Sequence, residues 1–343
     1  MRKDFAIFTH SAILSSTEIT IQNNKEIKME QQLKKQNRLQ NPMILTLIAL
    51  LCCALWGSAT PAIKTGYTLL EVEGISSIML FAGIRFFLAG VFTVMIFSIA
   101  RRKFLFPKKQ NWGRVLTVSA FQTVIQYILF YLGLAYTSGV KGTVASGTGA
   151  FFSVLIATLI FKQEKLTLKK ITACVMGFVG IVVINLNGLS FGGDWLDLMG
   201  VAFVMLSTVA YAFSSVLIKR YSPYEDPVTI SGYQFIIGGA LLALVGFFSG
   251  GSIDFSSVGG VLDLIYLAFL SAIAYSLWGI LLKHNPVSRV TVFTCSTPIF
   301  GTVLTMLLLP GESSAVNPVN LIITLVLVSS GILLLNFRRA DKK

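Results

Sequence analysis

The chain has 343 residues, of which 54% are hydrophobic and only 13% are charged, and its mean hydropathy is +0.76. Soluble domains usually carry about 25% charged residues, so the composition excludes an ordinary soluble protein and indicates a polytopic membrane protein. The apolar runs are continuous rather than alternating, which predicts membrane-spanning helices and not a barrel. The net charge of +13 indicates nucleic-acid binding only where it clusters on a soluble surface, so its placement decides its meaning.

The chain begins with a polar segment, residues 1–42, which contains NNKEIKMEQQLKKQNRLQNP and lacks the apolar core of a cleaved signal peptide. We expect a mostly disordered cytoplasmic tail. A start at Met29 would leave a short basic leader before the first helix, so two readings of residues 1–28 stay open: part of the native protein, or an extension upstream of its true start.

Apolar stretches of about 20 residues, long enough to cross the roughly 30 Å of hydrocarbon as helix, then recur along the chain. They predict an all-α membrane protein with ten transmembrane helices, at 43–63, 76–98, 115–136, 142–161, 168–186, 196–217, 228–249, 260–282, 290–309 and 318–337.

The basic residues sort by loop. With the N-terminus inside, all of the 28 Lys and Arg except Lys64, Arg85 and Lys141 fall in the tail, the cytoplasmic loops or the C-terminus. The positive-inside rule therefore predicts that both termini are cytoplasmic in the cell (plasma) membrane, and the placement argues against nucleic acid as a partner. Acidic residues gather on the opposite side: Glu71, Glu73, Asp194, Asp197, Asp254 and Glu312.

The chain also carries an internal duplication. Residues 137–164 align without gaps on 285–312, and the same offset pairs Tyr127 with Tyr275. Nearby offsets pair 85–86 with 234–235, 56–64 with 211–219, and 180–185 with 331–336. The halves, 43–187 and 194–337, each hold five spans, and an odd number inverts the second half in the membrane. Inverted repeats are typical of alternating-access transporters.

Three further motifs accompany the duplication. They are a first helix with Trp56, Pro61 and Lys64, an arginine followed by an aromatic residue at 85–86, and a fourth helix that ends in Lys-Gln-Glu. From 43 to 337 the chain resembles the EamA-type branch of the drug/metabolite transporter superfamily. The resemblance implies a cavity lined mainly by helices 1, 3, 4, 6, 8 and 9. It also implies cargoes that run from amino acids and their metabolites to nucleosides and amphiphilic drugs. The first and sixth helices differ at Pro61 and Val216, which argues against a strictly symmetric site.

Polar and aromatic residues inside the spans are the candidates for cargo binding. Trp56 and Thr60 share a helix face, and Pro61 frees the carbonyl of Gly57 by removing its donor. The alternative is that these residues serve helix packing and interhelical hydrogen bonds, with Lys64 reaching the outer surface. We expect the cargo to contact Trp56, Thr60, Gln126, Tyr127, Tyr211, Ser215, Tyr275, Trp278 and Ser296.

Arg85 is expected to be structural or gating, as are Pro61 and Pro298, because it lies in a helix outside the lining set that the resemblance implies. No Asp or Glu lies near the middle of any predicted span. A carboxylate proton relay is therefore not expected, and facilitated efflux, exchange and a proton carried by the substrate stay open. The four cysteines fall inside spans, and neither they nor the two histidines predict a metal site, a cofactor or enzyme chemistry.

These patterns predict an exporter of small organic metabolites, such as amino acids or related amphiphilic compounds, whose partners are its cargo and the bilayer. The alternative is a non-transporting integral membrane scaffold or sensor. Cargo identity and oligomeric state are not encoded in any motif that we recognise.

Overall fold

The computed structural model describes residues 39–137, 145–184, 195–308 and 317–336, with the single residues 142 and 186. The chain divides into two compact units, Met1–Leu45 and Thr46–Lys343. Of the first unit only the last few residues are described; there, Asn41 Oδ1 accepts a hydrogen bond from the Met43 amide at the start of α2 (Pro42–Leu69). Residues 1–38 of the predicted disordered tail lie outside the described residues, and residues 39–42 lead into α2. All contacts discussed below lie within the second unit.

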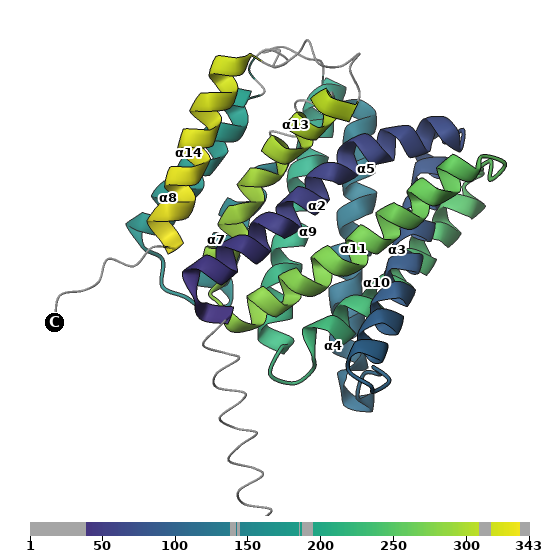
Figure 1. Ribbon diagram of the computed structural model, residues 1–343, viewed down its shortest axis with the longest axis horizontal. Coiled ribbons are helices and arrows are strands. Elements are labelled where there is room, and N and C mark those ends of the chain that lie inside the picture. Colours follow the sequence, from purple (N-terminus) through teal and green to yellow (C-terminus); the bar gives the residue numbers. More distant parts are fainter. Residues whose placement is uncertain are drawn as a thin grey trace, which may run out of the picture. The chain divides into compact units, whose positions relative to one another are not determined.

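The described part of the chain is helical and contains no strand (Figure 1). Seven helical segments are long and apolar enough to cross a membrane, which agrees with seven of the ten predicted spans. Six of them are α2, α3 (Gly74–Ala100), α9 (Trp195–Tyr221), α10 (Pro227–Phe248), α11 (Val258–His284) and α14 (Pro318–Asn336). The seventh, Lys109–Tyr136, is composite: η1 (Lys109–Asn111), α4 (Trp112–Ser119), a π-helical segment η2 (Ala120–Ile125) and α5 (Gln126–Tyr136).

The other three predicted spans are shorter or interrupted in the described residues. Part of the fourth is seen as α7 (Gly149–Leu155) and the π-helical η3 (Ile156–Ile160), while its residues 143 and 144 lie outside the description. The fifth is α8 (Leu168–Ile184), and the ninth is α12 (Val287–Thr291), a 3-10 segment η5 (Val292–Ser296) and α13 (Thr297–Leu308). The break at η5 has a cause: Pro298 has no N–H, so it leaves the carbonyl four residues earlier without a helical donor. Ten uninterrupted spans therefore stay a prediction.

Helices α3 and α10 pack against each other backbone to backbone along their lengths (Figure 1). A Cβ built on Gly83 would lie 2.2 Å from the Ala243 nitrogen, and one built on Gly239 would lie 2.3 Å from the Phe87 nitrogen. Glycine is thus required at both crossings, because small residues let membrane helices approach closely.

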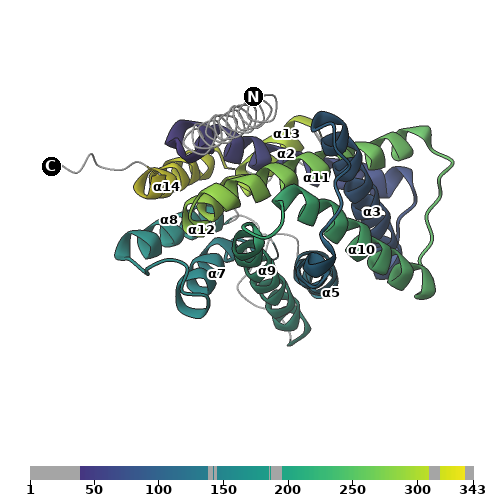
Figure 2. The ribbon, with the colours of Figure 1, turned by 90° about the horizontal axis from the view of Figure 1, so that it is seen from below.

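Helices α8 and α14 form a second close pair. Thr324 Oγ1 donates to the Gly180 carbonyl at 2.9 Å, and a Cβ built on Gly331 would lie 2.9 Å from the Ala173 carbonyl oxygen. In Figure 2, α9 lies between α7 and α5 and contacts both. Helix α9, in the second half of the sequence, thereby contacts α5 and α7 from the first half, and α11 contacts α3.

Candidate functional site

An aromatic cluster joins the two halves. The Trp56 ring on α2 lies 5.1 Å from the ring of Tyr275 and 4.9 Å from that of Trp278, measured between centroids, and both contacts are edge-on. Tyr275 and Trp278 are three residues apart on α11, a spacing that places both side chains on one face. The Tyr127 hydroxyl on α5 lies 3.0 Å from that of Tyr275, so the third predicted span reaches the same cluster.

Several polar atoms at this cluster are buried and have no hydrogen-bond partner within the described residues. A buried polar group without a partner costs about 1–3 kcal/mol, and the interiors of proteins contain few of them. Their concentration here is therefore unusual for a site that serves packing alone. The atoms are the indole nitrogens of Trp56 and Trp278, the Tyr211 hydroxyl and Ser215 Oγ. Gln126 Oε1 and both amide atoms of Gln122, on the segment that carries Tyr127, are also buried without a partner in the described residues.

Tyr211 and Ser215 reach the cluster from α9. Tyr211 and Ser215 are one turn apart on α9 and lie close to each other, and neither hydroxyl is assigned a hydrogen-bond partner within the described residues. It also lies within electrostatic range of Tyr127 and Tyr275. Gln126 is adjacent to Tyr127, directly after the π-helical segment η2, a distortion that often marks functional sites.

Two predicted site residues lie apart from the rings, at the crossing of α2 with the η5–α13 segment. Thr60 is exposed, and its Oγ1 lies 3.4 Å from a Cβ built on Gly301. Ser296 is buried at the end of η5, between residues that touch α2: Cys53 Sγ donates to the Phe293 carbonyl at 3.1 Å, and Phe300 packs on Gly57. The structure therefore brings together Trp56, Tyr127, Tyr211, Ser215, Tyr275 and Trp278. Gln126 is next to Tyr127 in the chain, and Thr60 and Ser296 lie at the crossing of α2 with the η5–α13 segment.

The two prolines act differently. Helix α2 continues through Pro61, so the proline does not break it, and the Gly57 carbonyl that it frees lies 3.6 Å from a Cβ built on Gly301. A Cβ on Gly57 itself would lie only 2.5 Å from the Phe300 Cβ. Pro298, by contrast, coincides with the interruption of the ninth predicted span.

Arg85 lies beside the cluster and is 6% exposed. Its Nε and NH2 atoms donate to Ser271 Oγ on α11 at 3.3 and 3.0 Å, and Ser271 Oγ donates to the Leu267 carbonyl. The guanidinium lies 5.2 Å from the centroid of the Phe86 ring. Among the described residues no carboxylate lies within 4 Å of it. Within its electrostatic range are Tyr67, Tyr127, Tyr131, Tyr275 and Asp263.

A second hydrogen bond between side chains joins α10 to the third predicted span. Thr123 Oγ1 donates to Gln234 Oε1 at 2.6 Å. Gln234 is the partner of Arg85 in the duplication, and Thr123 is the partner of Ser271 at the offset that pairs Tyr127 with Tyr275. A hydrogen bond therefore joins corresponding positions in both halves, with arginine as the donor in one and glutamine as the acceptor in the other.

Four residues near this site were not predicted from the sequence: Tyr67, Tyr131, Asp263 and Ser271. Asp263 Oδ2 is buried without a hydrogen-bond partner in the described ranges and lies 2.6 Å from a Cβ built on Gly66. The available signal was a four-residue spacing along α11, which places Asp263, Ser271 and Tyr275 on one stripe.

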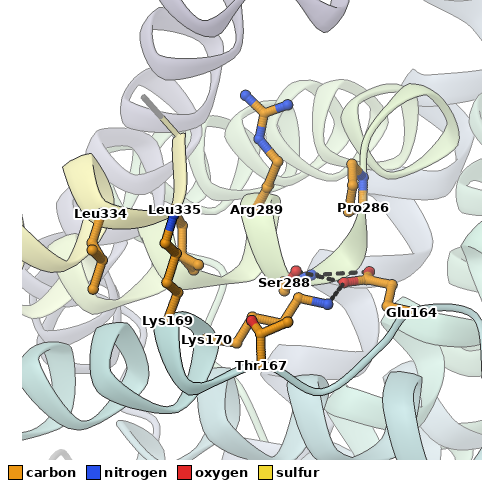
Figure 3. A pocket seen from close by; sticks show the side chains of 9 residues that line it. All are labelled: Glu164, Thr167, Lys169, Lys170, Pro286, Ser288, Arg289, Leu334 and Leu335. Carbon is orange, nitrogen blue, oxygen red and sulfur yellow. Dashed lines mark hydrogen bonds and ion pairs between the residues drawn. The ribbon is translucent and has the colours of Figure 1, made fainter. Parts of the chain in front are cut away.

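A separate polar site lies where the segment after η3 meets α12 (Figure 3). Glu164 accepts hydrogen bonds from Ser288 Oγ at 2.5 Å and from the Ser288 amide at 3.3 Å, and it pairs with Lys170 Nζ at 2.7 Å. The side chains of Glu164 and Lys170 are only 7% and 14% exposed. A pocket of about 360 Å³ opens here, lined by Glu164, Thr167, Lys169, Lys170, Pro286, Ser288, Arg289, Leu334 and Leu335.

Further hydrogen bonds at this end of the helices join α9 to residues of both halves. Lys219 Nζ donates to the carbonyls of Leu282 and Asn285 at 3.0 and 2.6 Å. Gln163 Nε2 donates to the Val216 carbonyl at 3.3 Å. Together with Glu164 they form a polar network across the end of the helices that the positive-inside rule assigns to the cytoplasm.

The described ranges contain no group of three or more His, Cys, Asp or Glu placed to hold a metal ion. All four cysteines are buried as free thiols.

With several apolar helices and a polar centre, the chain is a multi-pass helical membrane protein. The model of the EamA-like transporter family matches residues 43–186 and 198–337. The chain belongs to the EamA-like transporter family.

Similar proteins are known from archaea, bacteria and plants. An uncharacterized transporter of Archaeoglobus fulgidus is 27% identical over 74% of this chain and 86% of its own. The uncharacterized transporter YetK of Bacillus subtilis is 26% identical over 68% of this chain and 71% of its own. A chloroplastic WAT1-related protein of Arabidopsis thaliana is 23% identical over 80% of this chain and 66% of its own. One crystal structure superposes with a TM-score of 0.70 at 17% identity, over 84% of this chain and 95% of that chain, which shows a shared fold.

Proposed function

We propose that the protein is an alternating-access transporter that exports small organic metabolites, such as amino acids or related amphiphilic compounds. It is built from two inverted repeats, 43–187 and 194–337, in the plasma membrane with both termini in the cytoplasm. Family membership supports the transporter class, and the contacts below support the repeat and the site.

Contacts between α3 and α10 occur in pairs: where two residues touch, their partners in the duplication also touch. If a two-fold axis relates the repeats, a contact between two residues must recur between their partners. At the offset of 149 that pairs Arg85 with Gln234, the contact of Gly83 with Ala243 should recur between Gly232 and Val94. A Cβ on Gly232 does lie 2.8 Å from Val94.

Helices α8 and α14 behave in the same way at the offset of 151 that pairs 180–185 with 331–336. Gly180 packs on Leu327, and the partners of these residues, Gly331 and Met176, also touch, each at 3.6 Å from a built Cβ. The duplicated hydrogen bonds of Arg85 and Gln234 agree with the same rule. This reciprocity supports a two-fold axis in the membrane plane, which alternating access uses to exchange an inward-open for an outward-open state.

The observation that carries the site assignment is the group of unpartnered polar atoms around the aromatic rings, drawn from both halves. A scaffold core would gain stability from apolar side chains there, whereas a transporter needs polar groups that bind and release cargo. The proposed cargo-binding residues are Trp56, Thr60, Gln126, Tyr127, Tyr211, Ser215, Tyr275, Trp278 and Ser296. Pro61, Pro298 and Arg85 have structural or gating roles.

The Glu164 network supports a conformation closed on the cytoplasmic side. It joins the end of the fourth predicted span in the first repeat to the start of α12 in the second. We assign it as the inner gate.

The test is transport in proteoliposomes that contain the purified protein and are loaded with a panel of amino acids, amines, organic acids and nucleosides. Trp278→Ala and Gln126→Ala should weaken the apparent affinity for a transported compound by about 5- to 150-fold, the equivalent of about 1–3 kcal/mol. Phe269→Ala, an exposed aromatic on the same helix, is the matched control and should transport as wild type. If no compound moves, the non-transporting scaffold or sensor becomes the better reading. Full activity of both site variants would refute the site alone.

A further inference from the structure

The two halves differ in charge at one place in the membrane. Arg85 corresponds to Gln234, and Asp263 corresponds to Val115 at the offset that pairs Ser271 with Thr123. The first repeat's α3 therefore supplies a cation and the second repeat's α11 an anion, while both mirror positions are neutral. Packing that is shared by the repeats cannot explain either charge.

The hydrogen bond of Arg85 to Ser271 does not require a cation. On the mirror side a neutral glutamine joins the corresponding positions, with Gln234 Oε1 accepting a hydrogen bond from Thr123 Oγ1 at 2.6 Å. A charged side chain inside the membrane is costly and usually functional. The positive charge therefore has a role beyond joining α3 to α11.

Arg85 has spare hydrogen-bonding capacity. A guanidinium carries five N–H donors in a planar fork that matches a carboxylate. In the described part of the chain only Ser271 Oγ accepts from it, with Nε and NH2 sharing that one oxygen. Its guanidinium also lies 5.2 Å from the centroid of the Phe86 ring and within electrostatic range of the Tyr131 hydroxyl.

Asp263 is the complementary group. Its Oδ2 atom is buried without a described hydrogen-bond partner, beside Gly66 and Phe81. It lies on the same stripe of α11 as Ser271, eight residues away, which is about 12 Å along a helix. Asp263 and Arg85 interact electrostatically but do not form an ion pair. Arg85 thus lies beside the aromatic cluster, Asp263 lies farther along α11 toward its N-terminus, and neither forms an ion pair within the described residues.

We propose that these two residues select a zwitterionic cargo, with its carboxylate on Arg85 and its cationic group toward Asp263. The inference rests on the proposed transport function and gives Arg85 a cargo-binding role in addition to its tie to α11. A zwitterion compensates both charges, whereas a simple amine or a simple acid leaves one of them unpaired. The rings of Tyr127, Tyr275 and Trp56 supply an apolar surface for the body of the molecule.

The experiment measures equilibrium binding to the purified full chain with three probes that share one aromatic body. The probes are phenylalanine, phenethylamine, which lacks the carboxylate, and 3-phenylpropionate, which lacks the amine; the other natural amino acids extend the set. Wild type should bind a zwitterion at least 10-fold more tightly than the corresponding amine or acid.

Arg85→Gln copies the mirror residue and should keep the bond to Ser271. It should lose at least 10-fold in affinity for the zwitterion and the acid while the amine stays within two-fold. Asp263→Asn should show the reverse, losing the zwitterion and the amine but not the acid. Thr123→Val removes the mirror tie without touching a charge, and should leave the ranking of the three probes unchanged.

Three results would overturn the inference. One is an equal loss for all three probes in Arg85→Gln, which indicates a purely structural arginine. Another is a double variant, Arg85→Gln with Asp263→Asn, that regains wild-type thermal stability and probe preference. That result would mean that the two charges stabilise each other and do not bind the cargo. The third is wild type that binds no amino acid but transports an uncharged or singly charged compound, in which case transport stands and zwitterion selection fails.

Discussion

Neutralising Glu164 should open the cytoplasmic side of the protein. In Glu164→Gln the side chain keeps its size and can still accept from Ser288, but the pairing with Lys170 and the charge assistance are lost. These bonds are short, at 2.5 and 2.7 Å, and the side chains are nearly buried, so solvent screens them little.

The expected size follows from those contacts. Hydrogen bonds to charged groups contribute about 1.5–3 kcal/mol and neutral ones about 0.5–1.5 kcal/mol. The two bonds that cross between the repeats both come from Ser288, and replacing their charged acceptor by a neutral one should cost the closed state about 2–3 kcal/mol. This moves the equilibrium between closed and open states by about 30- to 150-fold.

The assay is the rate at which a maleimide labels a cysteine placed at Ser215, which is fully buried in the cluster, in a background without the native cysteines. In Glu164→Gln, labelling from the cytoplasmic side should rise by at least 10-fold. Lys165→Gln alters the adjacent charge, and since only the Lys165 carbonyl makes a described contact, it should label as the parent does. Unchanged labelling in Glu164→Gln would show that the network does not hold the gate.

Two further predictions concern packing and topology. Gly83→Ala should destabilise the protein by about 1–3 kcal/mol, because its Cβ would meet the Ala243 backbone at 2.2 Å, while Gly113→Ala, with no atom within 4 Å, should be neutral or slightly stabilising. Thermal unfolding in detergent compares the two variants, and equal midpoints would contradict the tight α3–α10 crossing. Cysteines at Glu71 and Asp254 should react with an impermeant reagent from outside intact cells. Reaction only after lysis would reverse the orientation.

The sequence alone determined the helical membrane class, most of the spans and the pairing of the halves, because apolar length and repeated residues are local or linear signals. It also indicated the aromatic and amide residues as candidates for cargo binding, since polar groups inside an apolar run can be recognised without any knowledge of their neighbours.

The tertiary structure decided what those residues face. Thr60 and Trp56 share a helix face by spacing, yet only Trp56 reaches the rings, because α13 packs against α2 at Gly57. Asp263 looked peripheral by its position near a helix end, and its environment became visible only when α11 was placed against Gly66 of α2 and beside α3. A residue's partners come from helices distant in sequence, and close approach between backbones, which linear patterns do not encode, determines which of them meet.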